Sequence, residues 1–329
     1  MTTLYLDRKG LELRLDGQAL ALYESDRRVR TVPLALLERI VIRAETVMSS
    51  GVLCALADAG TAVIMLSGRQ GRRVALVHGR AHNDARIRLA QYEHAHDHAY
   101  RLSWAQDLVK TKVTHQRKFL ERALAERPDL RKPLSDALDT LLSIQTSLVD
   151  GSHGIAETNK LLGIEGAAQA AYFRGFMTLF PESLGFTGRN RRPPRDPVNA
   201  CLSLGYTLVH FEAVRVAHAA GLDPLIGFFH VPAFGRESLA CDLVEPLRPR
   251  VDAWVREMFR ARLLRGEHFR MDKGACLLDK TGRARFYEQF EPFLNSTSRA
   301  LRRYCRLMVR MLQENVPNLP DSEDHGDDP

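Results

Sequence analysis

The chain has 329 residues, enough for one large domain or two ordinary ones, and a net charge of +7. Its last nine residues contain five acids and no Lys or Arg, so the remainder carries +12, which favours a polyanionic partner such as nucleic acid. The five cysteines are scattered and form no Cys-x-x-Cys pair, which argues against structural zinc and a disulfide framework. The sequence shows no N-terminal signal core and no apolar run of bilayer length, so we expect no membrane span and a cytoplasmic protein.

The first part of the chain, residues 3–78, is expected to consist mainly of strands. The stretch LELRLDG at residues 11–17 alternates apolar and polar side chains and ends in an Asp-Gly turn, which predicts a hairpin with a returning strand. A helix over residues 50–59 is expected to end at Gly60. We therefore predict a small β-rich domain over residues 1–83, whose strand edges a second copy could cover in a dimer. Further strands are expected at residues 28–33, 40–43, 62–66 and 73–78.

From residue 84 the composition changes to helical stretches, expected first at residues 86–105 and 107–125. His94 and His98 in the first stretch, with His96 between them, would share a face at i and i+4, but zinc would need two more ligands, so solvated or DNA-facing histidines are favoured. A short hairpin is expected within residues 271–281. The predicted fold class is α+β: the β domain, a larger and mainly helical domain over residues 84–316, and a disordered acidic tail over residues 317–329.

A helix with a face of small residues is predicted at residues 161–176. Glu165 is expected near its start, where the partial positive charge of the helix end favours a carboxylate. Gly166, Ala167 and Ala168 leave room beside this glutamate for another backbone, an ion or a phosphate. Close packing of helices is the ordinary alternative explanation for such small residues.

Residues 188–199 are expected to form a loop that three prolines stiffen and that carries four arginines. The planar guanidinium fork suits phosphate oxygens, and prolines reduce the entropy lost when a loop becomes ordered. The pattern is compatible both with a DNA contact and with a solvated charged loop. The four arginines are Arg189, Arg191, Arg192 and Arg195.

The stretch GFFHVPAFGRESLACDLVEPLRP at residues 227–249 predicts a capped helix. Ser238 can cap its first turn, which would place Asp242 and Glu245 at i and i+3 on one face. Pro246 and Pro249 each lack an amide hydrogen and crowd the preceding turn, so the helix is expected to kink or restart just after Glu245.

His230 lies upstream of this helix, beyond a loop containing Pro and Gly that could fold the histidine back towards the acids. Two carboxylates and one imidazole suggest manganese or magnesium, with open positions for substrate oxygens. The alternative is a capped helix with surface acids and an unrelated loop histidine.

Three stretches together carry a resemblance to a known family. They are LLGIEGAAQAAYF at residues 161–173, RRPPRDPVNACLSLGY at residues 191–206, and the stretch at residues 227–249. With them the chain resembles, from about residue 3 to about residue 312, CRISPR-associated protein 1, the metal-dependent DNA integrase that inserts new spacers into CRISPR arrays. The resemblance implies that the N-terminal β domain contributes to dimerisation and to contact with a partner.

The resemblance also implies a Mg²⁺ or Mn²⁺ ion held by Glu165, His230 and Glu245, with Asp242 as a neighbouring acid or further ligand. The ion would polarise the scissile phosphate and stabilise the displaced oxygen while a 3′-hydroxyl attacks. The implied partners are double-stranded DNA, as protospacer and CRISPR repeat, and CRISPR-associated protein 2, which bridges two dimers.

Phosphate contact is the role that the resemblance favours for the arginines of residues 188–199, with Asn199 bonding near the active site. Arg236 and Arg248 are candidates for phosphate contact or for orienting the acids. Two other functions stay open: a metal-dependent nuclease that cuts branched DNA with water as the nucleophile, and a non-catalytic DNA-binding scaffold whose acids only cap helices.

Overall fold

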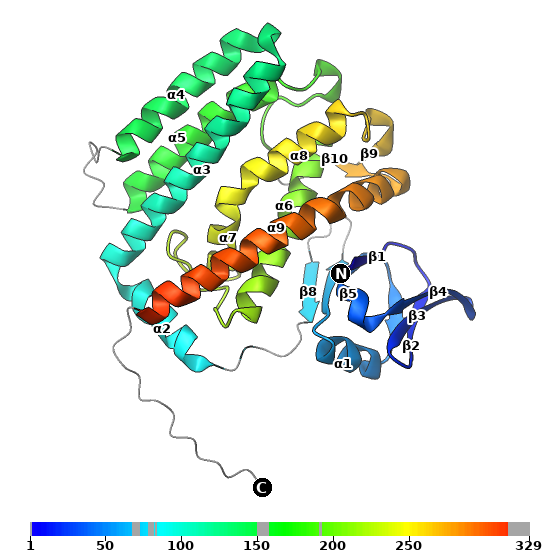
Figure 1. Ribbon diagram of the computed structural model, residues 1–329. Coiled ribbons are helices and arrows are strands. Elements are labelled where there is room, and N and C mark those ends of the chain that lie inside the picture. Colours follow the sequence, from blue (N-terminus) through cyan, green and yellow to red (C-terminus); the bar gives the residue numbers. More distant parts are fainter. Residues whose placement is uncertain are drawn as a thin grey trace. The chain divides into compact units, whose positions relative to one another are not determined.

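The computed structural model describes residues 2–67, 73–77, 82, 84–149, 158–190 and 193–314 (Figure 1). The predicted α+β class is confirmed, since strands dominate up to residue 77 and helices follow from residue 85. The chain forms two compact units: residues 1–81, 180–211 and 251–296 belong to the first, and residues 82–179, 212–250 and 297–329 to the second. The domain boundaries predicted at residues 83 and 316 stay predictions, and the acidic tail lies outside the described residues.

Two four-stranded sheets belong to the first unit. One has the order β1-β5-β7-β8, in which β1, β5 and β7 are parallel and β8 is antiparallel to β7. The other has the order β4-β3-β2-β6, and its β2–β3 pair is the predicted hairpin. Gly17 in the hairpin turn has a φ of 57°, a left-handed conformation that glycine adopts without strain. The strands are β1 (Thr2–Leu6), β2 (Leu11–Asp16), β3 (Ala19–Glu24), β4 (Arg27–Pro33), β5 (Leu37–Ile42), β6 (Thr46–Met48), β7 (Ala62–Ser67) and β8 (Arg73–Val77).

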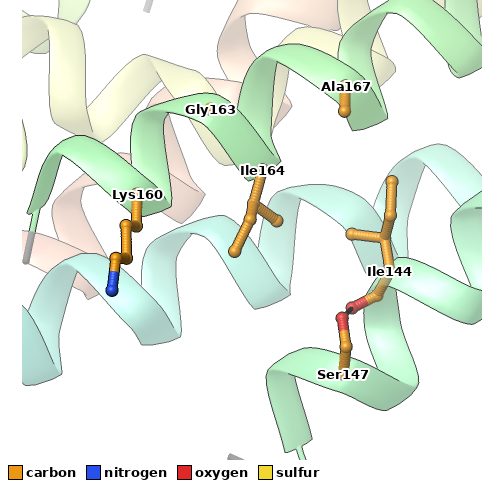
Figure 2. A pocket seen from close by; sticks show the side chains of 6 residues that line it. All are labelled: Ile144, Ser147, Lys160, Gly163, Ile164 and Ala167. Atoms are coloured by element: carbon orange, nitrogen blue, oxygen red, sulfur yellow. Dashed lines mark hydrogen bonds between the residues drawn. The ribbon is translucent and has the colours of Figure 1, made fainter. Parts of the chain in front are cut away.

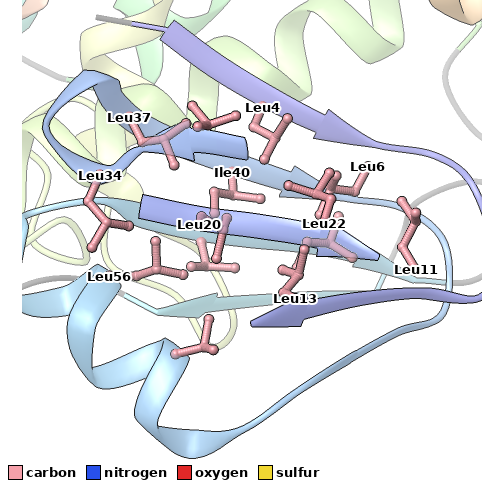
Figure 3. Close-up of a cluster of buried hydrophobic side chains, with 14 residues drawn as sticks. Leu4, Leu6, Leu11, Leu13, Leu20, Leu22, Leu34, Leu37, Ile40 and Leu56 are labelled. Carbon is pink, nitrogen blue, oxygen red and sulfur yellow. The ribbon is translucent and has the colours of Figure 1, made fainter. Parts of the chain in front are cut away.

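A cluster of aliphatic side chains forms the core of this β-rich part (Figure 3). Both sheets contribute to it, and so does α1 (Ser50–Asp58), which matches the predicted helix and inserts Leu56. Burying one such side chain contributes about 1.5–3 kcal/mol. The most deeply buried members are Leu13, Leu20, Ile40, Val52, Leu56 and Val63.

The rest of the first unit is helical apart from one short hairpin. Strands β9 (Phe269–Asp272) and β10 (Ala275–Leu278) form an antiparallel hairpin that overlaps the predicted segment and begins two residues before it. Trp254 of α8 (Arg248–Arg260) packs edge-on against Phe286 and Phe290 of α9 (Lys280–Glu314). Helices α6 (Pro197–Ala219) and α9 contribute residues to both units.

The second unit contains the helices α2 (Ala85–His96), α3 (His98–Glu126), α4 (Arg131–Val149), α5 (Thr158–Met177) and α7 (Ser238–Val244). Helices α3, α4 and α5 lie side by side (Figure 1). Gly175 permits the close approach, because a Cβ there would lie 3.1 Å from Ala137 Cβ and 3.2 Å from Leu120 Cδ1. None of the helices in the described part of the chain is both long and apolar enough to cross a membrane.

The predicted helix over residues 86–105 is interrupted at Asp97. Its carboxylate accepts two amide hydrogens from the first turn of α3, so Asp97 ends α2 and caps the next helix. His94 and His98 therefore lie on different helices, and their expected pairing at i and i+4 is wrong. Nδ1 of His94 bonds to the carbonyl oxygen of Ala90 at 2.8 Å instead.

Candidate metal centre

All the predicted metal ligands belong to the second unit, and three segments bring them there. Helix α5 carries Glu165, the loop before α7 carries His230, and a 3₁₀ turn, η4 (Glu245–Leu247), carries Glu245. Helix α3 packs against both α5 and η4 and so links the segments. Glu165 lies two turns into α5 rather than near its start, because α5 already begins at Thr158; a favourable helix end therefore does not explain this glutamate.

The predicted break after the second acid is confirmed. Helix α7 ends at Val244, η4 covers the next three residues, and α8 begins at Arg248. The predicted cap is wrong: Ser238 is the first residue of α7, and its hydroxyl donates to the carbonyl oxygen of Val231 at 3.2 Å. Ser238 therefore ties the loop that follows His230 to α7.

Asp242 is completely buried and holds the histidine loop in place. Its Oδ2 accepts the amide hydrogens of Phe228 and Phe229 at 2.8 and 3.0 Å, and its Oδ1 accepts that of His230 at 2.9 Å. Nδ1 of His230 lies 2.6 Å from Oδ1. Because both oxygens already accept backbone hydrogens, the proton of this contact belongs to Nδ1, which directs Nε2 away as a potential ligand atom.

Glu165 and Glu245 converge on one cation, the ammonium of Lys112 on α3. Lys112 Nζ donates to Glu165 Oε1, and to Glu245 Oε2 at 2.5 Å. The second oxygen of Glu245 accepts from Arg248 Nε at 2.8 Å. This contact is the one that an orienting role of Arg248 requires, and both roles predicted for Arg248 stay predictions.

The two acids of the α7–η4 segment have opposite electrostatic environments. Burial acts to raise the pKa of Glu245, but Arg248 and Lys112 outweigh it and lower that pKa to about 2. Burial raises the pKa of the Asp242 carboxyl, although its bond with His230 opposes the rise. The two cations therefore favour the ionised form of Glu245, in which both of its oxygens can bind a cation.

The side chains of Glu165, Glu245 and His230 are of the types that bind a divalent metal, although the ammonium of Lys112 lies between the two carboxylates. No group of three His, Cys, Asp or Glu side chains is assembled for a metal among the residues that the structure describes. Glu165 and Glu245 nevertheless each place an oxygen on the same cation, and His230 is near enough to Glu245 to influence its pKa. Two carboxylates and one imidazole are ligands that Mg²⁺ and Mn²⁺ accept.

Lys112 is a site residue that the sequence patterns did not reveal. It lies in the buried stripe of α3 that Leu108, Val109 and Val113 form, where a lysine is unexpected. A lysine on the apolar face of a helix was the feature of the sequence that could have indicated a buried, functional position. Its partners are 53 and 133 residues away in sequence, so nothing local identified them.

Comparison with known proteins gives a family for the chain. The model of the family "CRISPR associated protein Cas1" matches residues 4–292. A CRISPR-associated endonuclease Cas1 of Thermodesulfovibrio yellowstonii is 38% identical over 297 residues, which cover 89% of this chain and 92% of that relative. The chain belongs to the Cas1 family.

Solved structures agree with the Cas1 fold. A CAS1 protein from Thermotoga maritima has a TM-score of 0.82 at 22% identity and covers 98% of this chain and 100% of its own. A casposase bound to an integration product has a TM-score of 0.81 at 21% identity, with coverage of 97% and 92%. A chain in a Cas6-RT-Cas1–Cas2 complex has a TM-score of 0.77 at 23% identity, with coverage of 95% and 35%. At these identities the structures support the fold alone.

The predicted DNA-binding residues of the arginine loop belong to the first unit and differ in exposure. Asn199 is fully buried; it bonds to the carbonyl oxygen of Gly188 at 2.7 Å and accepts from Arg189 at 2.7 Å. Both residues therefore brace this loop of the Cas1 chain. Arg195 is exposed, and its contact with DNA stays a prediction. Arg191 and Arg192 lie outside the described residues.

Arg236 braces the turn that follows His230. Its guanidinium donates to the carbonyl oxygen of Val231 and, at 3.3 Å, to the hydroxyl of Ser238. A structural role thus accounts for its position, and its predicted contact with phosphate stays a prediction.

A groove of about 520 Å³ lies between α4 and α5 (Figure 2). Small and apolar side chains line most of it, so the predicted small-residue face of α5 adjoins a hollow. None of the four candidate ligands lines this groove. Its lining residues are Ile144, Ser147, Lys160, Gly163, Ile164 and Ala167.

Proposed function

We propose that this Cas1-family chain is the metal-dependent integrase and endonuclease of CRISPR adaptation, which joins spacer DNA to the CRISPR array by attack of a 3′-hydroxyl on a phosphodiester. The observation that carries the proposal is the convergence of Glu165 and Glu245 on one cation beside an oriented His230. Membership of the Cas1 family supplies the substrate class.

Glu165, Glu245 and Nε2 of His230 would hold Mg²⁺ or Mn²⁺. When bound, the metal would supply polarisation of the scissile phosphate and stabilisation of charge on the departing oxygen. Asp242 keeps the proton on His230 Nδ1, which leaves the lone pair of Nε2 for the metal, and we assign His230 as a ligand rather than as a general base. Arg248 keeps Glu245 ionised and in position. The exposed Arg195 contacts the DNA backbone.

Double-stranded DNA and a Cas2 protein are the proposed partners. The support for Cas2 is family membership, together with the similar chain that occurs in a complex with Cas2. We propose the cytoplasm as the location, where a CRISPR array is accessible. A homodimer is also proposed, and sedimentation of the full chain over a range of concentrations tests it; a monomer at every concentration would reject it.

Joining of DNA strands tests the reaction. Labelled duplex with free 3′-hydroxyls, incubated with repeat DNA and Mn²⁺, should give longer labelled strands on a denaturing gel. Glu165→Ala should give none while it still binds DNA. Shortened strands without joined products would instead favour the branched-DNA nuclease, and DNA binding without any metal-dependent product would favour the scaffold.

A further inference from the structure

A lysine is buried at the centre of the acidic site. Lys112 is 3% exposed, and its ammonium contacts one oxygen of Glu165 and one of Glu245. The stem of Lys112 lies in the apolar stripe of α3, which contacts both α5 and η4. A buried charge of this kind is stable only when it is paired, and here both partners are the proposed metal ligands.

The charges around the two acids already balance. Glu165 and Glu245 contribute two negative charges, and Lys112 and Arg248 contribute two positive ones through ion pairs of 2.8 Å or less. A divalent cation added to this neutral set would be repelled by the adjacent ammonium. It would also compete with that ammonium for the same oxygens.

We propose that Lys112 is an internal counter-cation of the metal centre: it holds the two carboxylates together in the metal-free protein, and a metal ion binds by displacing its ammonium from at least one of them. The flexible four-carbon stem of lysine lets the ammonium move while the stem stays packed. Arg248 keeps Glu245 in place meanwhile, because it binds the other oxygen. The inference rests on the proposed function, since it needs Glu165 and Glu245 to be ligands.

The counter-cation role of Lys112 is tested by titrating the full chain with Mn²⁺ in the absence of DNA. Electron paramagnetic resonance measures the free Mn²⁺ and so gives the dissociation constant. Lys112→Met removes the competing charge and keeps the apolar stem, so its dissociation constant should be lower than that of the wild type by about tenfold or more. Lys110→Met is the matched control: it removes an exposed lysine from the same helix and should leave the constant unchanged. An unchanged or higher constant in folded Lys112→Met overturns the proposal.

Thermal unfolding gives a readout independent of catalysis. Without metal, Lys112→Met leaves the buried carboxylate of Glu245 facing the partly buried carboxylate of Glu165 without the ammonium between them, so its melting temperature should fall below that of the wild type. Saturating Mn²⁺ should raise it more than it raises the wild-type value. A metal-free melting temperature equal to that of the wild type contradicts the proposal.

Lys112→Arg keeps the proposal testable if Lys112→Met does not fold. The guanidinium stays charged and binds carboxylates with a fixed fork, so Mn²⁺ binding should be weaker than in the wild type; tighter binding overturns the proposal. Glu165→Gln separates the two levels of inference. If Glu165→Gln leaves Mn²⁺ binding intact, the assignment of Glu165 as a ligand in the proposed function is wrong. If Glu165→Gln abolishes Mn²⁺ binding but Lys112→Met does not tighten it, only the counter-cation role of Lys112 is wrong.

Discussion

Two acids three residues apart, Asp242 and Glu245, have different tasks in this site. Asp242 bonds to three backbone amides and to the ring of His230, which uses both of its oxygens. Each carboxylate oxygen of Glu245 accepts from a side-chain cation, one from Lys112 and the other from Arg248. The sequence placed both on one helical face and left their ranking open. The ranking depends on where residues 228–230 return, and spacing along a helix does not contain that information.

Loss of a proposed ligand should abolish strand joining, whereas loss of the histidine's support should only weaken it. Glu165→Ala, His230→Ala and Glu245→Ala should each remove a proposed metal contact and with it several kcal/mol of charge stabilisation at the phosphate. Asp242→Asn keeps the volume and one acceptor, so activity should fall by about 10–100-fold and recover partly at high Mn²⁺. Joined product, DNA binding and circular dichroism are measured in parallel. An inactive Asp242→Asn beside an active Glu245→Ala would reverse the two assignments.

The lowered pKa of Glu245 predicts an acid-sensitive contribution to stability. Its folded-state pKa, about 2, lies below the ordinary value of 4.5, so the ionised form is favoured by folding. The stability that follows is present above the ordinary pKa and is lost as the pH falls towards about 2. The difference in unfolding free energy between wild type and Glu245→Gln should therefore shrink as the pH falls from about 5 to about 3.

Urea unfolding of the metal-free proteins at several pH values measures this difference. Glu121→Gln, which removes an exposed acid on α3, serves as the control and should show a much weaker trend. A difference that stays constant over this range would mean that the two cations do not stabilise Glu245 in solution.

The segment from α7 to α8 shows how far local rules predict an element. Pro246 and Pro249 were enough to predict the restart of the helix, because a missing amide hydrogen and a ring clash are local effects. The predicted cap at Ser238 is wrong, because the hydroxyl bonds instead to the carbonyl oxygen of a residue seven positions earlier in the loop, which the local sequence does not reveal. Glu165 and Lys112 meet only through the packing of α3 against α5.

The loop that precedes α7 depends on a glycine, Gly227, that lies close to Asp242 and His230. A Cβ at Gly227 would lie 2.7 Å from Asp242 Oδ2 and 2.8 Å from the backbone oxygen of His230, closer than real Cβ atoms come. Gly227→Ala must therefore shift the loop that orients His230. We expect a loss of stability of about 1–3 kcal/mol and a fall in strand joining that exceeds this loss.

Gly163→Ala is the matched control for this substitution. A Cβ there meets open space inside α5, so stability should rise by up to about 1 kcal/mol and activity should be unaffected. Unfolding in urea and the strand-joining assay measure both variants. Wild-type activity in Gly227→Ala would show that the close approach of this glycine does not position the histidine.

The class and order of the whole molecule were predictable, because alternating and three-to-four-residue patterns are strong over long segments. The two compact units were not, since each assembles segments far apart in the chain. The arginine loop illustrates the same limit. Its four arginines looked equivalent, yet Arg189 bonds to Asn199 and Ser203, while Arg195 is exposed. The difference between Arg189 and Arg195 comes from the packing around the buried Asn199, which the sequence does not show.

Affinity for DNA should reveal which arginines contact phosphates. Each neutralised phosphate contributes about −0.9 to the slope of log K against log salt, so Arg192→Ala with Arg195→Ala should flatten the slope by roughly 2. Arg27→Ala with Arg30→Ala removes the same charge from exposed positions of β4 and should change it less. Fluorescence anisotropy of labelled duplex over a salt series measures all three proteins. An unchanged slope in the first variant would make the loop a solvated surface, because a phosphate contact cannot be lost without releasing fewer counterions on binding.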